Sequence, residues 1–544
     1  MARTPRPVTL PVSVDRSTSV SLPVQIAGQL RSLIETGTLV PGTELPSTRS
    51  LARLAGVSRG TVVAAYEQLT AEGCIVAAEG SGTIVSPDLA AVPRPAAAEH
   101  PPTPTKPHNR GQAPRTSRES ESEGAAADEF RANDQTDAAR RSSRGSAGAG
   151  STSSISLLPS RVDGSGVVSP MWRAAWRAAA REAEEDFREG SSEPLGLAEL
   201  RVAFADRLRR VRGMPASAER VVVTAGARDG LRLVLDCLQL RMGPGGEATG
   251  SAGSAGAAGS TAAGRPVLSI GIESPGYPGL RRVVEALGHR LIPVPVDDHG
   301  LVPEQIPNGL DALIVTPSHQ YPLGGSLPLA RRLAVLAAAQ AHGFAVIEDD
   351  HTAEFRWDAA PLPTLAGLAV SERAPVVLLS SLASLISPGI ALGHLHVPAE
   401  WIDDLAVLRA QLGAPVSRIL QRAAARLIES GGLERHAAAV RTQHRIKLDV
   451  VRTVLGRAPG FHVDEVPGGL AAVVTVDLPE AELVAGAQAH GVQVQPLSEY
   501  WAGQGPGGVG DGGLPDGIVV GFGGPEDELH TGLRRLVEAA RSLR

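Results

Sequence analysis

The pattern of hydrophobic and polar positions divides the chain into two patterned regions with a polar stretch between them. Residues 20–86 combine helical periodicity with turn signals, and from Ile155 onward short apolar runs alternate with amphipathic helices. Residues 87–154 are rich in Pro, Ala, Ser, Gly and charged side chains and almost free of large apolar ones. Such a segment cannot bury enough surface to offset the loss of chain entropy, so we expect a disordered linker there.

The region from residue 155 to 544 has the rhythm of an α/β domain. Its short apolar runs VVVTAG, PVLSIG, ALIVTP, AVIEDD and VVLLSS are each followed by a helical or turn segment. This alternation predicts a mainly parallel sheet, and residues 243–265 interrupt it as a flexible low-complexity insertion. Residues 374–399 carry no Asp, Glu, Lys or Arg, but their serines, Pro388 and Gly389 favour two buried strands joined by a turn over a membrane span.

Residues 20–86 predict two short helices in a helix-turn-helix, with a preceding helix and a two-stranded wing. The preceding helix has an apolar face formed by Ile26, Leu30, Leu33 and Ile34. Ser47 and Ser58 can cap the next two helices, and Gly56 can end the first of them. Two short strands around Gly80-Ser81-Gly82 complete the wing.

The motif L-P-S-x-R-x-L-A…G-V-S-R-x-T-V…A-Y-x-x-L…E-G…G-S-G-T resembles the winged-helix domain of GntR-type regulators over nearly all of residues 20–86. In such a unit the N-terminal end of the second helix meets base edges in the major groove, and Arg59 can pair with guanine or bind phosphate. The resemblance implies DNA contacts from Arg49, Ser58, Arg59, Gly60, Thr61, Gly80 and Ser81. Residues 1–86 hold seven Arg against six acidic residues, so charge alone does not predict DNA binding. A winged helix used only for protein contacts is the alternative.

Residues 155–540 resemble fold-type-I aminotransferases, in particular the MocR branch, in which such a domain follows a GntR-type head. The resemblance lies in SEPLGLAELR, VVVTAGARDGL, ESPGYPG, VTPSHQYPLG (which contains His319) and VIEDDHTAEFRWD. It implies a cofactor phosphate at the helix that Gly226-Ala227-Arg228 begins, with Tyr277 near the pyridine ring. It also implies that Asp349 pairs with the pyridine nitrogen and that His351 replaces the family's aromatic hydroxyl.

The residues that the family uses for covalent chemistry are replaced. SSLASLISPGIALG stands where the family has G-T-F-S-K-T-L-A-P-G-L-R-L-G, which aligns the Schiff-base lysine with Ser384. The serine before that lysine is Ala383, and the phosphate-binding arginine is Ala391. A serine cannot form an imine. We therefore predict an inactive site with no catalytic residue and no covalent cofactor; pyridoxal phosphate is expected by resemblance only.

Other charged residues do not replace the missing ones. The whole chain has two lysines, Lys106 in the predicted linker and Lys447 in a helical segment where the family has no catalytic group. No Arg or Lys lies between Arg457 and Arg534, where the family's substrate-carboxylate arginine is expected.

These observations favour a DNA-binding transcriptional regulator whose aminotransferase-like domain serves dimerisation and the sensing of a small-molecule effector. The expected effector pocket, a degenerate cofactor site, comprises Gly226, Ala227, Arg228, Tyr277, His319, Asp349, His351 and Ser384. Two alternatives are a working pyridoxal-phosphate aminotransferase with a DNA-binding head, and a DNA-tethered scaffold without a ligand. The first requires a usable lysine.

Location and partners follow from composition. Cys74 and Cys237 are the only cysteines and lie far apart, which favours a reducing compartment. The N-terminus has no sustained apolar run, and the histidines do not fall into metal-ligand spacing. We expect a cytoplasmic, nucleoid-associated homodimer that binds operator DNA and neither a membrane nor a metal.

Overall fold

The computed structural model describes most of both predicted ordered regions. The described residues are 10, 12–16, 22–35, 37–71, 74–78, 82–87, 89, 154–159, 161–164, 169–189, 193–243, 266–357, 362–369, 374–502 and 516–544. The linker predicted over 87–154 and the insertion predicted over 243–265 fall almost wholly outside them, so both stay predictions.

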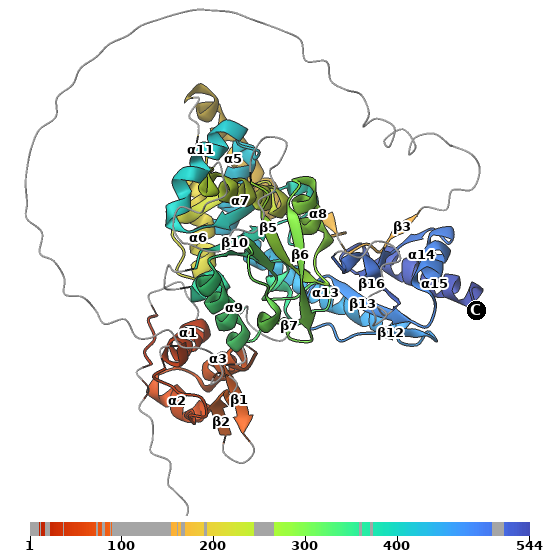
Figure 1. The fold of residues 1–544 in the computed structure, drawn as a ribbon, viewed down its shortest axis with the longest axis horizontal. Coiled ribbons are helices and arrows are strands. Elements are labelled where there is room, and N and C mark those ends of the chain that lie inside the picture. The colour runs from red at the N-terminus through yellow and green to blue at the C-terminus, as the bar shows by residue number, and fades with distance from the viewer. Residues whose placement is uncertain are drawn as a thin grey trace, which may run out of the picture. The chain divides into compact units, whose positions relative to one another are not determined.

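The N-terminal head is a winged helix-turn-helix, as the sequence predicts (Figure 1). Its elements are α1 (Leu22–Glu35), α2 (Thr48–Leu54), α3 (Arg59–Ala71), β1 (Ile75–Ala78) and β2 (Gly82–Val85). Ser47 Oγ accepts a hydrogen bond from Ser50 N, and Ser58 Oγ accepts one from Thr61 N, so both predicted N-caps are confirmed. Gly56 has φ +64°, a left-handed conformation that favours glycine in the turn between α2 and α3.

The head is held together by the predicted apolar positions. Ile26, Leu30 and Ile34 are buried on α1, whereas Leu33 is only half-buried. Val62, Tyr66 and Leu69 of α3 join the same core, and the Tyr66 hydroxyl donates to the carbonyl of Pro46 at 2.6 Å. Strands β1 and β2 pair antiparallel to form the wing.

A mainly parallel sheet of eight strands forms the centre of the C-terminal region. The strand order is β4 (Val221–Thr224), β11 (Gly393–His396), β10 (Val376–Ser381), β9 (Ala345–Asp349), β8 (Ala312–Val315), β5 (Ser269–Ser274), β6 (Arg290–Asp297) and β7 (Gly300–Leu301). β11 and the edge strand β7 run opposite to the other six strands. The five apolar runs each became one strand, which confirms the predicted fold class.

Helices cover both faces of the sheet, and the side chains of each strand point to the two faces alternately. Val377 and Leu379 of β10 face a core that includes α7 (Ala227–Met242), α8 (Pro278–Ala286) and α11 (Ile402–Leu412). Val376 and Leu378 face the opposite side, covered by α6 (Ala198–Arg212), α9 (Leu329–His342), α10 (Leu365–Leu368) and α12 (Arg418–Glu429).

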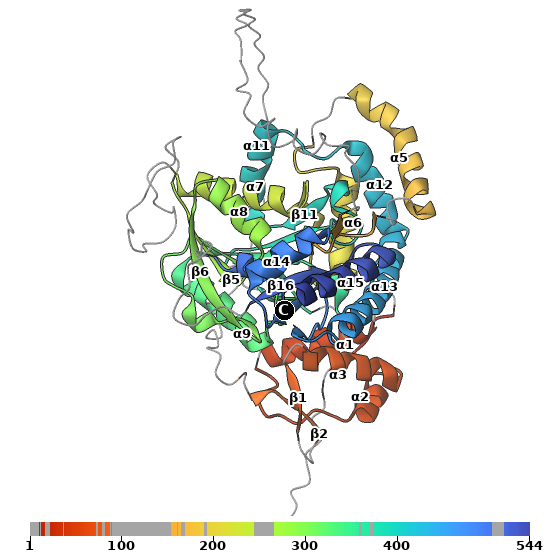
Figure 2. The same ribbon diagram turned by 90° about the vertical axis from the view of Figure 1, so that its right-hand side faces the viewer.

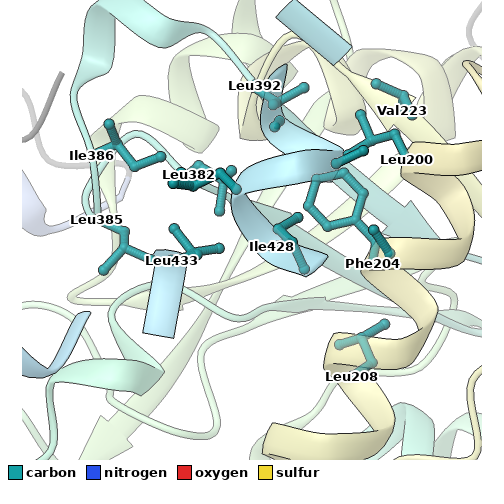
Figure 3. Packing of buried hydrophobic residues seen from close by; sticks show 14 of the residues in the cluster. Leu200, Phe204, Leu208, Val223, Leu382, Leu385, Ile386, Leu392, Ile428 and Leu433 are labelled. Atoms are coloured by element: carbon teal, nitrogen blue, oxygen red, sulfur yellow. The ribbon is translucent and has the colours of Figure 1, made fainter. Parts of the chain in front are cut away.

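The core around α6 and α12 shows how the elements are fixed (Figure 3). Leu200 and Phe204 of α6 are 0% exposed and pack with Ile428 of α12 and Leu382 of the segment after β10. Complete burial of such a side chain stabilises the fold by about 1.5–3 kcal/mol. Helix α5 (Pro170–Glu189) lies along α12 on the outside of this core (Figure 2).

The chain ends in a smaller lobe around an antiparallel sheet. The strand order is β12 (Phe461–Val463), β13 (Ala471–Val476), β16 (Gly517–Gly521) and β15 (Gln495–Pro496). Its helices are α13 (Gly432–Leu455), α14 (Glu480–Ala489) and α15 (Glu526–Ser542). Strand β3 (Ile155–Ser156) pairs with β14 (Val492–Gln493), so the start of the C-terminal region returns to this lobe.

Residues 374–399 form the predicted pair of buried strands. Strands β10 and β11 pair antiparallel, with Leu379 opposite Leu395. Within the part of the chain that the structure describes, no helix is both long and apolar enough to cross a membrane.

Candidate functional site

The predicted DNA-reading residues gather at the N-terminal ends of α2 and α3. Arg49, Ser58, Arg59 and Gly60 are exposed, and Thr61 is half-buried. Arg59 Nε lies 3.4 Å from Thr48 Oγ1, so the side chain at the start of α3 reaches the first residue of α2. Two of the predicted contacts, Gly80 and Ser81, lie outside the described residues.

A second group of polar residues, which includes the predicted Asp349, gathers where β5, β8 and β9 end. Strand register brings together Glu273 of β5, Thr316 directly after β8, and Asp349 of β9. Glu273 accepts hydrogen bonds from the backbone N–H of Thr316, at 3.1 Å, and from its hydroxyl. The carboxyl ends of parallel strands are where open α/β sheets bind ligands.

This edge of the sheet holds two buried acids. Asp349 is 4% exposed; burial, together with the carboxylates of Asp350 and Glu273, raises its pKa to about 8. Burial also raises the pKa of Glu273 to about 7, against the hydrogen bonds from Thr316. Burial therefore favours the protonated form of each carboxyl group.

Aromatic rings surround the end of β9. The imidazole of His351 lies parallel to the ring of Tyr277 with centroids 5.7 Å apart, and edge-on to Tyr321 at 5.4 Å. Tyr500, from the smaller lobe, adds a tilted ring 5.5 Å from Tyr321. Tyr277, Tyr321 and His351 thus form an aromatic cluster at the end of β9. Burial lowers the pKa of His351 to about 4.

His319 lies near His351 of this cluster. It is 5% exposed, and a β-carbon on Gly469 would lie 2.5 Å from its Nε2. Burial, with the nearby His351 and Arg356, lowers the pKa of His319 to about 3. The imidazole of His319 is therefore neutral, and it fills space in the core as well as offering polar nitrogens.

The expected phosphate end lies at the start of α7. Gly226 adopts φ +95° before the first turn, which Ala227 and Arg228 begin. A β-carbon on Gly226 would lie 3.5 Å from Ser381 Oγ, so the helix start is next to the end of β10. Free N–H groups at a helix N-terminus attract anions. Asp229, however, already accepts from Ala225 N and pairs with Arg409 at this position.

The residues around this site do not fit an imine-bound pyridoxal phosphate. Ser384 is half-buried in the turn after β10 and offers a hydroxyl, and Ala391, with φ +46°, offers no cation. Lys447 is 5% exposed, and its Nζ donates to the carbonyl of Gly524 at 2.7 Å. Lys106 lies outside the described residues. Asp349 and Tyr277 could contact the pyridine ring of the cofactor, but they supply neither the imine nor the phosphate contact.

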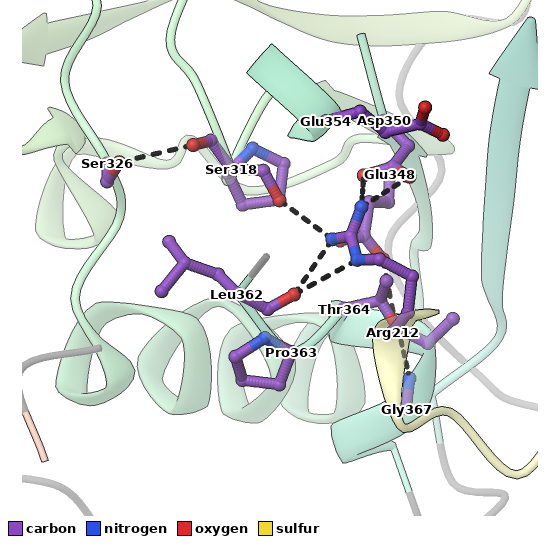
Figure 4. A network of polar contacts seen from close by, with 12 residues as sticks. Arg212, Ser318, Ser326, Glu348, Asp350, Glu354, Leu362, Pro363, Thr364 and Gly367 are labelled. Atoms are coloured by element: carbon purple, nitrogen blue, oxygen red, sulfur yellow. Dashed lines mark hydrogen bonds and ion pairs between the residues drawn. The ribbon is translucent and has the colours of Figure 1, made fainter. Parts of the chain in front are cut away.

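A buried polar network anchors the segment that carries Asp349 (Figure 4). Arg212 Nη1 lies 2.5 and 2.6 Å from the two carboxylate oxygens of Asp350. The same guanidinium donates to Ser318 Oγ at 3.0 Å and to the carbonyl of Leu362. One arginine of α6 thereby binds three segments: the one after β8, the one after β9 and the one before α10.

Comparisons with known proteins agree on both regions. Residues 22–85 match the family "Bacterial regulatory proteins, gntR family", and residues 247–507 match "Aminotransferase class I and II". The chain is 37% identical over 531 residues to the HTH-type pyridoxine biosynthesis transcriptional regulator PdxR of Corynebacterium glutamicum, covering 97% of this chain and 98% of that protein. The chain belongs to the MocR-type GntR regulators.

One further relative and one solved structure of similar fold support the architecture of this MocR-type regulator. The probable rhizopine catabolism regulatory protein MocR of Rhizobium meliloti is 27% identical and covers 97% of this chain and 96% of its own length. The Pyrococcus horikoshii kynurenine aminotransferase superposes with a TM-score of 0.58 at 19% identity, covering 72% of this chain and 92% of that chain. The regulator therefore joins a GntR DNA-binding head to a fold-type-I aminotransferase fold.

Sequence reasoning missed several residues of the regulator's candidate site. Glu273, Thr316, Tyr321 and Tyr500 all contact the predicted site residues or each other. The first three lie inside or beside the motifs ESPGYPG and VTPSHQYPLG, so their place in those motifs was an available signal. Tyr500 lies in no such motif, and only the fold brings it to the cluster.

Proposed function

We propose that the aminotransferase-like domain of this regulator does not catalyse transamination and instead serves dimerisation and the sensing of a small molecule. The observation that carries the proposal is Ser384 at the position of the Schiff-base lysine. A hydroxyl cannot condense with an aldehyde to give an imine, and it cannot shuttle the protons that transamination requires. The bond made by Lys447 to Gly524 O supports the proposal, because it commits the one described lysine elsewhere.

The effector pocket is formed by the residues that the family uses for its cofactor. It comprises Gly226, Ala227, Arg228, Tyr277, His319, Asp349, His351 and Ser384, to which the geometry adds Glu273 and Tyr321. Aromatic walls with a few convergent polar groups are typical of small-molecule sites. A flat ring with a basic nitrogen would stack on Tyr277 and share the proton of Asp349.

The head binds DNA through the N-terminal ends of α2 and α3. Arg49, Ser58, Arg59, Gly60 and Thr61 are the proposed contacts, with Gly80 and Ser81 of the wing. A two-fold dimer of the aminotransferase-like domain would present two such heads to an inverted-repeat operator. A cytoplasmic location follows from this function.

Borohydride trapping tests the inactive site. The purified protein is incubated with pyridoxal phosphate, reduced with sodium borohydride and mapped by peptide mass spectrometry. Because the chain has only two lysines, the Lys106→Arg/Lys447→Arg double variant is a lysine-free control. We expect no pyridoxyl group on either lysine of the wild type and no transaminase turnover.

A stoichiometric pyridoxyl group on Lys447, absent from the double variant, would overturn the proposal. Ser384→Lys alone is expected not to restore turnover, because Ala383 and Ala391 still replace a hydroxyl and a cation of the phosphate site. Charge-assisted hydrogen bonds contribute about 1.5–3 kcal/mol each, so one lost phosphate contact weakens binding about tenfold or more.

A further inference from the structure

Two glutamines of α1 hold a short segment that precedes the region matched by the gntR family. Gln29 accepts a hydrogen bond from Ser13 N at 3.0 Å and donates to Ser13 O at 2.6 Å. One turn earlier, Gln25 accepts from Asp15 N at 2.9 Å and donates to Asp15 O at 2.8 Å. Each side-chain amide thus satisfies both backbone groups of one residue, as a neighbouring strand would.

The spacing of the two elements explains why this arrangement forms. Gln25 and Gln29 are four residues apart on a helix, which corresponds to about 6 Å along its axis. Ser13 and Asp15 are two residues apart in an extended segment, which corresponds to about 6.6 Å. Side chains alternate along this extended segment: Val12 is buried, at 7% exposed, whereas Ser13 and Asp15 are exposed. We call residues 12–16 the strap.

The strap ends at the turn of the helix-turn-helix. Arg16 Nη2 donates to the carbonyl of Gly56 at 2.9 Å, and Gly56 lies two residues before Ser58. Arg16 is exposed, and among the described residues this is its only hydrogen bond. A guanidinium has five N–H donors, so the others stay available to a partner next to the start of α3.

We propose that the strap is part of the DNA-binding domain and that Arg16 donates to a DNA backbone phosphate beside the recognition helix. The partner is defined by its chemistry. When α3 lies in the major groove, the turn before it approaches the phosphates that border the groove, and arginine binds phosphate through paired N–H groups. The bond to Gly56 O holds the guanidinium in place before DNA binds, which reduces the entropy lost on contact.

Salt dependence distinguishes a phosphate contact from a purely structural role. Each phosphate that a protein neutralises contributes about 0.9 to the slope of log K against log salt concentration. The probe is a fluorescent duplex selected from a random library by the wild-type protein, and binding to the full-length chain is measured by anisotropy at several salt concentrations. Arg16→Gln can still donate to Gly56 O but carries no charge, whereas Arg16→Lys keeps the charge.

We expect Arg16→Gln to bind about tenfold more weakly and to lower the slope by about 0.9 for each head on the DNA. Arg16→Lys is expected to keep the wild-type slope. The Gln25→Ala/Gln29→Ala variant, which releases the strap, should lose the same slope as Arg16→Gln when both are measured at a temperature where the variant is folded. An unchanged slope in Arg16→Gln, whether or not its affinity falls, would overturn the phosphate contact. An unchanged slope in the double variant would overturn the role of the strap.

Discussion

Arg212 and Asp350 form a buried ion pair in which one guanidinium nitrogen lies 2.5 and 2.6 Å from both carboxylate oxygens. The side chains are 2% and 8% exposed. Asp350 follows Asp349 directly, so the pair fixes the backbone of the residue that the family uses to hold its pyridine nitrogen. The regulator has this anchor although, by resemblance to the family, Ser384 stands where the imine lysine is expected. We take this as support for a pocket that still binds a ligand.

Removing one partner of this pair should destabilise the regulator strongly. Arg212→Ala leaves the Asp350 carboxylate buried without its partner, which costs about 3–5 kcal/mol of the free energy of unfolding. Arg232, which is 58% exposed and 3.7 Å from Asp236, is the matched control, and Arg232→Ala should change stability by less than about 0.5 kcal/mol. Urea unfolding of both full-length variants measures the difference. A loss below about 1 kcal/mol in Arg212→Ala would contradict the role of the pair.

His394 should make the regulator sensitive to acid. This residue of β11 is 1% exposed, stacks on Phe204 with ring centroids 4.2 Å apart, and has no hydrogen-bond partner for either ring nitrogen within the described residues. Burial, with the charge of Arg207, lowers its pKa from 6.5 to about 3. The unfolded chain binds this proton at a higher pH than the folded chain does. The free energy of unfolding therefore decreases as the pH falls below the pKa of the unfolded His394.

The His394→Phe variant isolates this effect, since it keeps the stacked ring and removes the titrating nitrogens. Between about pH 7.5 and about pH 5 the wild type should lose about 2 kcal/mol more stability than the variant. The comparison uses only the change in the free energy of unfolding between the two pH values. Any cost of packing the larger phenylalanine ring is the same at both pH values and cancels. Parallel pH profiles for the two proteins would show that His394 does not titrate on unfolding.

Arg59 should account for part of the DNA specificity. If it reads a guanine from the start of α3, Arg59→Ala costs about 1–3 kcal/mol of binding and relaxes discrimination at one base position. Gel-shift titration against the selected duplex and its single-base variants measures both effects, with Arg232→Ala as a control outside the head. Equal affinity of Arg59→Ala and wild type would remove Arg59 from the reading surface.

The regulator should be a dimer through its C-terminal region. Fold-type-I aminotransferase folds place their sites at a two-fold interface, and two heads on one operator gain affinity from being linked. Light scattering at micromolar concentration should give twice the mass of the chain, and the mass should not depend on added pyridoxal phosphate. A monomer under these conditions would count against both the assembly and the proposed operator symmetry.

The sequence by itself determined the parts of this regulator that depend on short-range signals. The caps Ser47 and Ser58, the glycine turn at Gly56 and the strand-like apolar runs act within a few residues, so their pattern predicts the head and the strands of the large sheet. The prediction that Ser384 stands at the position of the Schiff-base lysine also comes from the sequence alone, because it depends on residue identity at one aligned position.

Only the tertiary structure decided which distant residues meet. Glu273 approaches Asp349 because β5, β8 and β9 are neighbours in the sheet, although 75 positions separate the two acids along the chain. Arg212 reaches Asp350 because the last residue of α6 packs against the segment that directly follows β9. Periodicity carries no information on strand order or on the choice of partner for a buried charge. Those are set by the packing of whole elements, in which most buried polar groups find a partner.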